Sequence, residues 1–358
     1  MIMKHRFTTV SLRPYTYLAP SVQTKGCAFL LVLLPHVCLL FLTHSWGALG
    51  VVAGAVLASF AVTGIGCCFA RPGAFVWVAA LVRGLVIGLL VPSSYPPLAV
   101  FLVALCVLLL CAHVLGGFTD AWVNPVALTV AVCWLLRTDL FPALALGAED
   151  LQTQNVALAL IQDGTFPVMG ADTRITAFLN KNVFGIFGVS IPEGYVSLLW
   201  DSHAPVAAFR FNLLTLVTSV VLISFDIVSA LVPAVYLAVY ALLVRFLAPM
   251  CYGGTVGQGD MLFALLTSGT LFCTLFLLQW YGTTPVTAAG KVAYGIFAGV
   301  AAFLIVGAGG SGAGSAFTIL VMNVVSPLIV AAETAAEKQY LHALLLPRVR
   351  AFKDGHHA

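Results

Sequence analysis

Apolar runs of about 20 residues, long enough to span a bilayer as helices, recur along the chain between short polar turns. They fall into two groups of five, on either side of a polar stretch over residues 138–209. We therefore predict an all-α, polytopic integral membrane protein of about ten transmembrane helices. The runs lie near residues 27–44, 47–69, 74–92, 98–117 and 122–137, and near 210–229, 231–249, 260–280, 288–308 and 314–332.

The two groups of runs share one detail of sequence. Asn124 and Pro125 lie at the fifth run, and Asn323 and Pro327 lie in the tenth. Because each group has an odd number of helices, two copies of one fold would insert in opposite orientations. Transport proteins often combine inverted repeats with interrupted helices near the bilayer midplane. We predict two inverted five-helix repeats; the alternative is that Asn and Pro occur in both runs by chance.

The distribution of basic residues predicts the orientation. With the N-terminus inside, ten of the 16 Lys and Arg residues face the cytoplasm, five lie outside, and Arg83 falls within a run. An excess of basic residues in short cytoplasmic segments is the usual bias. Both termini are therefore predicted to be cytoplasmic. The predicted segments are a cytoplasmic N-terminal segment (1–26), helices one to five (27–137), an external loop (138–209), helices six to ten (210–332) and a cytoplasmic tail (333–358).

The composition supports a membrane location. Hydrophobic residues make up 61 % of the chain and charged residues 8 %, with a mean hydropathy of +1.06. Soluble domains carry roughly 25 % charged residues, so lipid must cover much of this surface. The net charge of +3 is spread thinly, which argues against a nucleic-acid partner. Most of the nine cysteines lie in apolar runs and none forms a CxxC motif, so we interpret them as small hydrophobic residues.

Few ionisable residues fall within the predicted helices, where such residues are often functional. Arg83 either lines a polar interior or extends to the interface or to a neighbouring charge. Asp226 is either interfacial or functional, and His36, beside Pro35, is interpreted as a hydrogen-bonded core residue. No nucleophile elbow, phosphate-binding loop or metal-ligand cluster is present, so we predict neither a catalytic residue nor a metal site.

Glycine and proline interrupt several apolar runs. The interruptions fall at residues 88–97, 113–128, 283–291 and 307–317. Unwound backbone at membrane depth is tolerated only where protein buries it or where it lines a cavity. These segments are therefore either simple turns between helices or parts of a polar cavity.

Four segments, in order, resemble one family. Residues 83–97 form a small-residue helix that ends in a Pro-rich turn, and 113–128 contain Gly-Gly followed by Asn-Pro-Val-Ala-Leu. Residues 268–305 include Thr-Thr-Pro-Val-Thr-Ala, and 314–329 resemble the last helix of the family. The family comprises the RnfD component of the Rnf electron-transport complex and the NqrB component of the sodium-pumping NADH:quinone reductase Nqr. The chain length is closer to that of RnfD.

The resemblance implies a subunit of a redox-driven ion translocase in the bacterial inner membrane, not catalytic alone. It implies that electrons pass through two flavins, a covalent FMN on the external side and a non-covalent riboflavin nearer the cytoplasm. The implied partners are other membrane and peripheral Rnf-type subunits, a flavin transferase for maturation and the lipid bilayer.

The external flavin motif departs from the family pattern. The family carries FMN on the Thr of a Ser-Gly-Ala-Thr-like motif. Gly170 and Ala171 match this motif, but Asp172 stands at the position of the Thr, and Thr173 follows it. A shift by one residue makes Thr173 the candidate acceptor, whereas the alternative is an ordinary loop threonine. Asp172 beside an FMN phosphate would repel it.

The inner flavin motif matches the family in part. Asn124 and Pro125 match, and Gly116 and Gly117 precede them as in the family. The second Asn of the family pattern is Ala121 here. We expect Asn124 and Pro125, with the two glycines, to contact riboflavin.

A further candidate wall of the inner cavity comes from the second half of the chain. It consists of Thr284, Pro285 and Thr287. The family has Asp at the positions of Thr284 and Val330. Acidic residues there would be natural ligands for a cation or proton, so their replacement argues against ion pumping by this subunit more than against the fold.

Two other functions fit the same pattern. A transporter or channel for a small neutral solute would use ten helices in two inverted halves and few buried charges. A scaffold subunit without a cofactor is the third possibility. The long external loop favours the redox function, because a simple pore does not need one.

Overall fold

The protein is helical throughout the part of the chain that the computed structural model describes, with one isolated bridge between Pro92 and Val206. This confirms the all-α prediction. The described residues are 21–69, 75–114, 123–141, 156–162, 167–252, 255–280, 284–307 and 312–354. Gly116 and Gly117 lie outside them.

The first half of the membrane bundle follows the predicted apolar runs. Pro96 and Asn124 directly precede two of its helices, each of which begins with proline, a residue favoured in the first helical turn. The helices are α1 (Val22–Leu42), α2 (Trp46–Phe69), α3 (Phe75–Leu90), α4 (Pro97–His113) and α6 (Pro125–Leu136).

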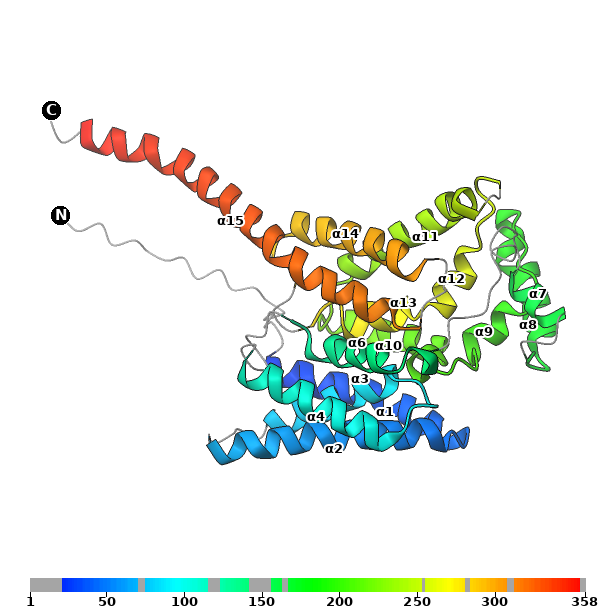
Figure 1. The fold of residues 1–358 in the computed structure, drawn as a ribbon. Coiled ribbons are helices and arrows are strands. Elements are labelled where there is room, and N and C mark those ends of the chain that lie inside the picture. The colour runs from blue at the N-terminus through cyan, green and yellow to red at the C-terminus, as the bar shows by residue number, and fades with distance from the viewer. Residues whose placement is uncertain are drawn as a thin grey trace, which may run out of the picture.

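The connection between the halves forms short helices at one end of the bundle (Figure 1). Polar residues and turn formers interrupt its apolar segments, so no helix described here exceeds 11 residues. The elements are η1 (Thr138–Leu140), α7 (Val156–Gln162), α8 (Asp172–Asn182), η3 (Phe184–Phe187), α9 (Tyr195–Trp200) and η4 (Ala207–Phe209).

The second half contains the remaining apolar helices. Among the described residues, α1, α2, α11, α14 and α15 are long and apolar enough to cross a membrane, and α3, α4, α6 and α10 are shorter apolar helices. This is the pattern of a multi-pass membrane protein. The second-half helices are α10 (Asn212–Ser224), α11 (Leu231–Tyr252), α12 (Met261–Thr267), α13 (Thr270–Phe276), α14 (Ala288–Val306) and α15 (Gly314–Asp354).

Two predicted helices differ from the structure. The apolar run at 260–280 was predicted as one helix, but it forms two short helices, α12 and α13, that meet at Ser268 and Gly269. The last helix was predicted to end near residue 332, yet α15 continues without a break to Asp354. Neither Gly nor Pro follows residue 332 before Pro347, so nothing in the local sequence stops the helix there.

The packing of the helices repeats between the halves. In the first half α2 packs against α3 and α4, α1 packs against α3, and α6 packs against α3 and α4. In the second half α11 packs against α12, α13 and α14, α10 packs against α13, and α15 packs against α13 and α14. Across the halves α1 contacts α10, and α6 contacts α15, as a two-fold relation requires. The prediction of two five-segment repeats is confirmed.

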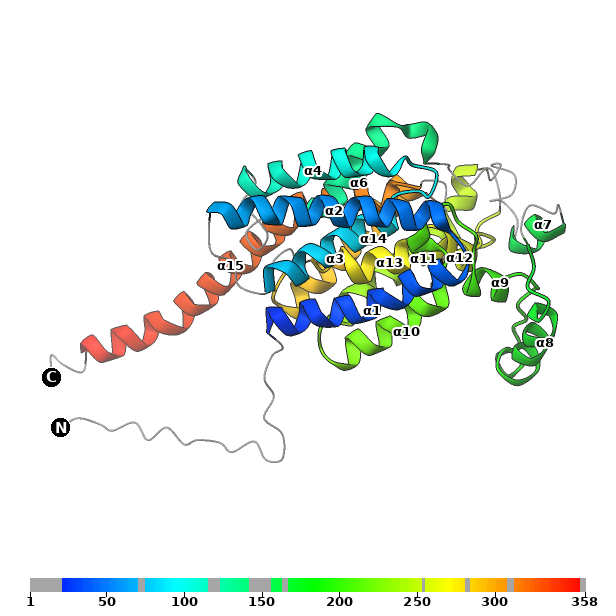
Figure 2. The same cartoon turned by 90° about the horizontal axis from the view of Figure 1, so that it is seen from below.

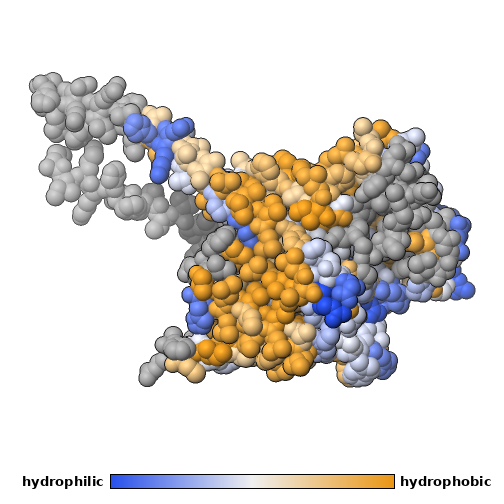
Figure 3. Space-filling model, in the orientation of Figure 1, coloured by the Kyte–Doolittle hydropathy of each residue, from blue (hydrophilic) through white to orange (hydrophobic). Residues whose placement is uncertain are grey.

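The repeats are inverted. The start of α1 and the end of α15 lie at one end of the bundle, and α8 and α9 lie at the other (Figure 2). The first half therefore begins at the end opposite to the one where the second half begins. Figure 3 shows apolar side chains covering the bundle between its two ends, which is the surface that lipid would contact.

Glycines allow close contact between neighbouring helices. A Cβ atom added at Gly84 or Gly88 of α3 would lie 2.5 or 2.4 Å from the Cα atom of Val56 or Val52 in α2. Helix packing in membranes depends on such small residues because lipid provides no hydrophobic force between helices. Gly295 and Gly299 of α14 pack against α11 in the same way.

Of the three ionisable residues singled out within the predicted helices, two lie inside the bundle. His36 Nε2 lies 3.3 Å from Thr215 Oγ1, and its Nδ1 lies 3.2 Å from the Val32 carbonyl oxygen. His36 is thus the hydrogen-bonded core residue that we expected. Arg83 is buried, and its Nη2 donates to Thr63 Oγ1 at 3.3 Å, so it lies inside the bundle between α2 and α3. Asp226 is exposed at the turn between α10 and α11.

Candidate functional site

Asp172, the first residue of α8, joins α8 to α9. Its side chain is fully buried. One carboxylate oxygen accepts from the Thr176 hydroxyl at 2.9 Å and from the Gly194 N–H at 3.2 Å. The other accepts from the N–H and the hydroxyl of Ser197, at 2.8 and 2.5 Å. Asp172, at the position where the resemblance leads us to expect a flavin-bearing threonine, therefore has a structural role in this protein.

These hydrogen bonds also set the charge of Asp172. Burial by itself raises the pKa of the carboxyl, but the hydrogen bonds from Ser197, Gly194 and Thr176 lower it, so the pKa lies below its ordinary value. The carboxylate is ionised at neutral pH, and both oxygens face the α8–α9 contact. The expected repulsion between this residue and a phosphate on Thr173 is therefore reduced, because hydrogen-bond donors surround the charge.

Thr173 is exposed in the first turn of α8, and Arg174 beside it is exposed too. The N–H groups of a first helical turn point out of the helix and attract anions. An Arg guanidinium also pairs with phosphate. Gly170 and Ala171 are exposed before the helix, and a Cβ added at Gly170 would meet no atom within 4 Å. Packing within the described protein therefore does not require glycine at this position.

Asn124 and Pro125 begin α6 inside the bundle. Asn124 is buried, and its Oδ1 accepts from the N–H groups of Val126 and Ala127 at 2.9 and 3.3 Å. Its Nδ2 donates to the carbonyl oxygen of Leu277, just after α13, at 3.3 Å. Asn124 thus starts one helix and binds the end of another. The two inner-motif residues described by the structure lie where α6 meets the broken segment of the second half.

The second predicted wall of the inner site lies at the start of α14. Thr287 is exposed, accepts from the Gly290 N–H at 3.0 Å and is bonded to Glu333 of α15. Thr284 is half-buried and Pro285 is buried. Thr287 therefore caps a helix, and no hydrogen bond recorded for the described residues joins it to Asn124.

Two buried polar side chains near the inner motif were not among the predicted site residues. Asn323 of α15 and Thr274 of α13 are buried, and within the described part of the chain the Asn323 Nδ2 and Thr274 Oγ1 atoms have no hydrogen-bond partner. The two helices contact each other. Buried polar atoms without partners are costly, so these two atoms are the candidate contacts for a polar ligand in this part of the bundle. The Asn323-Pro327 pair was the one signal in the sequence.

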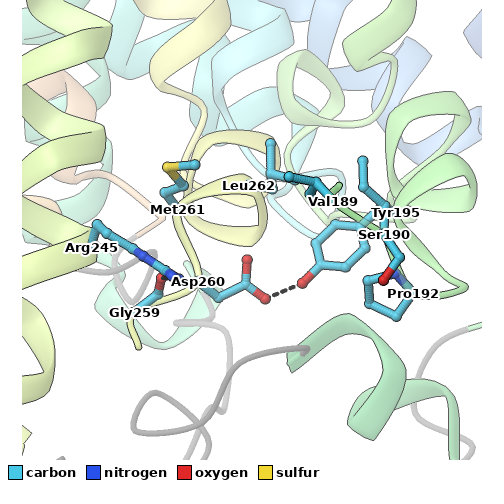
Figure 4. A pocket seen from close by; sticks show the side chains of 10 residues that line it. Val189, Ser190, Pro192, Tyr195, Arg245, Gly259, Asp260, Met261 and Leu262 are labelled. Carbon is cyan, nitrogen blue, oxygen red and sulfur yellow. Dashed lines mark hydrogen bonds between the residues drawn. The ribbon is translucent and has the colours of Figure 1, made fainter. Parts of the chain in front are cut away.

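A small pocket with a few polar groups lies between α11 and the start of α12, beside the connection between the halves (Figure 4). It measures about 120 Å³. Tyr195 donates from its hydroxyl to Asp260, and Arg245 Nη1 donates to the Gly259 carbonyl oxygen at 3.0 Å. Burial raises the pKa of Tyr195, and the nearby Asp260 charge raises it further, so the Tyr195 hydroxyl keeps its proton. The Tyr195–Asp260 bond attaches α9 to the start of α12, and the Arg245–Gly259 bond holds the segment before α12 against α11.

Comparison with known proteins shows that the chain is similar to subunits of ferredoxin:NAD(+) oxidoreductase complexes. It is 22 % identical over 256 residues to the D subunit of the proton-translocating ferredoxin:NAD(+) oxidoreductase complex of Clostridium ljungdahlii, which covers 70 % of this chain and 71 % of that protein. It is 33 % identical over 117 residues to the D subunit of the Na(+)-translocating ferredoxin:NAD(+) oxidoreductase complex of Acetobacterium woodii, covering 32 % of this chain and 33 % of that one. A family model described as "NQR2, RnfD, RnfE family" matches residues 9–337. The chain therefore belongs to the NQR2, RnfD, RnfE family.

Proposed function

We propose that this protein is the D-type membrane subunit of an ion-translocating Rnf-type electron-transport complex. The observation that carries the proposal is the family match over residues 9–337, which spans both five-segment repeats. The names of both relatives identify D subunits of ferredoxin:NAD(+) oxidoreductases. The protein works with other membrane and peripheral subunits of the complex and is not catalytic alone.

The proposed location is the bacterial inner membrane, with both termini in the cytoplasm. The excess of Lys and Arg in short loops and termini on the N-terminal side supports this orientation. The end of the bundle that carries α8 and α9 is then external (Figure 1). Thr173 faces the compartment outside the cytoplasm in this orientation.

The external site fits a covalently attached FMN. We assign Thr173 as the acceptor because its side chain is exposed in the first turn of α8, whereas Asp172 is buried and bonded to α9. Arg174 and the first-turn N–H groups would stabilise the phosphate. The exposed Gly170 and Ala171 leave the approach to α8 open for a flavin transferase. When bound, a flavin supplies one- and two-electron redox chemistry.

We propose that the inner flavin is a riboflavin held where α6, α13 and α15 meet. Asn124 of α6 is hydrogen-bonded to Leu277 just after α13, and α15 contacts both α6 and α13. Buried Thr274 of α13 and Asn323 of α15 supply a hydroxyl and an amide. The Asn323 Nδ2 and Thr274 Oγ1 atoms have no partner among the described residues, so a ligand there would satisfy them. These side chains add no net charge, and the surrounding helices exclude water from the site.

The test of the redox function is flavin fluorescence. The chain is expressed with a flavin transferase, purified, and run on a denaturing gel under ultraviolet light. We expect a fluorescent band that disappears in Thr173→Ala and persists in Thr176→Val, which removes the hydroxyl of the neighbouring buried threonine. A solvent extract of the native protein is expected to contain riboflavin, and less of it in Asn323→Leu.

The outcomes separate the parts of the proposal. A dark band beside a fluorescent known acceptor overturns the covalent FMN at Thr173. Riboflavin in the extract then leaves a carrier with one flavin. Neither flavin in an intact, folded protein overturns the redox role. Solute flux in vesicles without redox partners would then establish transport, and its absence would establish a scaffold subunit.

A further inference from the structure

An apolar cavity lies where the external loop meets the membrane helices. Its volume is about 290 Å³, near the lower limit of roughly 300–1,000 Å³ for ligand pockets. Residues of α8 and α9 form one side, and residues of α10, α12 and α13 form the other. The cavity adjoins the smaller pocket of Figure 4, and Tyr195 lines both.

The polar side chains in the lining of the cavity are already hydrogen-bonded to other groups of the protein. The Thr176 hydroxyl donates to Asp172, and the Tyr195 hydroxyl donates to Asp260. The Asn180 side chain uses both ends of its amide on the backbone of Ile191, at 2.8 Å each. The rest of the lining is hydrocarbon, and most of it is leucine.

This chemistry selects the class of occupant. A polar group that entered the cavity would lose its hydrogen bonds to water without replacement, which costs several kcal/mol on water-to-hydrocarbon scales. Cavities with apolar walls stay dry and bind apolar molecules. The occupant is therefore a hydrocarbon group.

The cavity shares Leu216 with the exposed apolar surface of the bundle. On α10 the side chains of Leu213, Leu216, Val217 and Val220 are exposed along one side of the helix. Leu216 belongs to this row and also lines the cavity. A hydrocarbon chain can thus pass from the bilayer into the cavity without crossing a polar surface.

The length of α10 is relevant to how far the apolar layer extends. Its 13 residues extend about 20 Å, whereas the hydrocarbon core of a bilayer is about 30 Å thick. The apolar layer therefore continues beyond at least one end of α10, and the cavity lies beside one of these ends, near Asn212, whose amide binds the carbonyl oxygens of Leu198 in α9 and Leu266 in α12.

We propose that this cavity binds an acyl chain of a membrane lipid. The chain enters beside Leu216 and lies between Leu199 of α9 and Leu265 of α12. A bound chain would fill the space between the external helices and the bundle, and so would stabilise their contact. The site does not depend on either flavin.

The experiment uses a lipid with a photoreactive acyl chain. The full-length protein is reconstituted into vesicles of phosphatidylethanolamine and phosphatidylglycerol that contain a trace of phosphatidylethanolamine with a diazirine near the end of one acyl chain. After illumination, labelled peptides are identified by mass spectrometry. We expect label on Leu199 and Leu265 in the cavity and on Val220, which reports ordinary contact with lipid.

The key variant is Leu265→Trp, which fills the cavity. It should lower labelling of the α9 peptide several-fold and leave the labelling of Val220 unchanged. Leu304→Trp is the matched control, since Leu304 of α14 is 74 % exposed on the apolar surface, and it should change neither peptide. Leu199→Phe is a second variant that fills the cavity, for use if Leu265→Trp does not fold. It should lower the labelling of the α12 peptide several-fold and leave the labelling of Val220 unchanged.

Three results overturn the proposal. The first is that α9 and α12 of the wild type are labelled no more than background although Val220 is labelled. The second is equal labelling of α9 in the wild type and in a folded, filled variant. The third is cavity labelling that appears only in Thr173→Ala, which would show that an attached flavin occupies the cavity instead. A missing flavin with intact cavity labelling contradicts only the proposed redox function.

Discussion

The third segment of each repeat shows how differently the two halves treat the same place in the fold. In the first half it is α3, a continuous helix of 16 residues that packs closely on α2 through Gly84 and Gly88. In the second half it is the pair α12 and α13, which meet at Ser268 and Gly269. Both segments are apolar, so hydrophobicity alone does not explain the difference.

The break between α12 and α13 depends on residues elsewhere in the chain. Gly269 has a φ of +71°, and a Cβ added there would lie 2.0 Å from the Phe209 ring. The Thr270 N–H lies 3.4 Å from Ser268 Oγ, in place of the regular helical bond to Leu266. The Leu266 carbonyl accepts instead from Asn212 Nδ2 at 2.7 Å. Interrupted backbone in a membrane is stable only when such partners satisfy it.

Replacing Gly269 should have the largest effect on this comparison. In Gly269→Ala the positive φ costs roughly 1–2 kcal/mol, and the overlap with Phe209 adds about 1–3 kcal/mol. We expect the apparent free energy of unfolding in mixed micelles to fall by about 2–5 kcal/mol in total. Gly64→Ala is the control, because a Cβ there meets no atom within 4 Å. Equal stability of the two variants would refute the account of the break.

Removing the Asn212 amide should cause the next largest loss of stability. Asn212→Leu leaves the carbonyl oxygens of Leu198 and Leu266 without their donor, at a cost of about 1–3 kcal/mol for a buried unsatisfied group. Hydrogen exchange should rise in α12 and α13 and stay unchanged in α3. The matched control is Asn182→Leu on the exposed surface of α8. Uniform loosening of both halves would contradict a local role for Asn212.

A larger side chain at Gly88 tests whether the continuous helix α3 depends on its close contact with α2. In Gly88→Ala the new Cβ would overlap Val52. Overpacking costs about 1–3 kcal/mol, and the higher helix propensity of Ala returns about 0.5–1 kcal/mol. These ranges leave a net loss of about 0–2.5 kcal/mol. We expect the upper part of this range, measured as in the Gly269 series, because the new Cβ would overlap the backbone of Val52. No loss in Gly88→Ala, relative to Gly64→Ala, would show that α2 and α3 can move apart freely.

Acidification should have the smallest effect on stability. The effect should be confined to residues 201–212, which include Phe209, the residue that packs on Gly269. Burial raises the pKa of Asp201, but the Arg210 guanidinium, 2.6 Å away, and the His203 N–H lower it below its ordinary value. The folded protein therefore binds fewer protons at Asp201 than the unfolded chain. This stabilisation is complete above the unfolded pKa of about 3.9 and is lost as the pH falls through the lower folded pKa.

Hydrogen exchange, corrected for its intrinsic pH dependence, measures this effect. We expect a several-fold rise over residues 201–212 below pH 4 and no change in α3. Asp201→Asn should show faster exchange in this segment already at pH 7 and little further change on acidification. If the pH dependence of hydrogen exchange were the same in the wild type and in Asp201→Asn, the Asp201–Arg210 pair could not be the cause of the faster exchange in acid.

The sequence predicted those features that depend on local composition. Ten apolar segments, their division into two groups and the family resemblance could all be read from it, because a membrane segment needs only sufficient length and hydrophobicity. Asn124 and Pro125 also predicted the start of a helix, since a capping side chain followed by proline is a local signal.

The tertiary structure decided how the interrupted or buried polar groups are satisfied. The break at Gly269 requires Asn212, which lies 54 residues before the carbonyl that it binds. Asp172 was expected to disturb a phosphate, but its carboxylate binds Ser197, 25 residues later. No local pattern encodes such partners. Their positions follow from the packing of helices that lie far apart in the sequence, and in a membrane that packing must satisfy every polar group that water cannot reach.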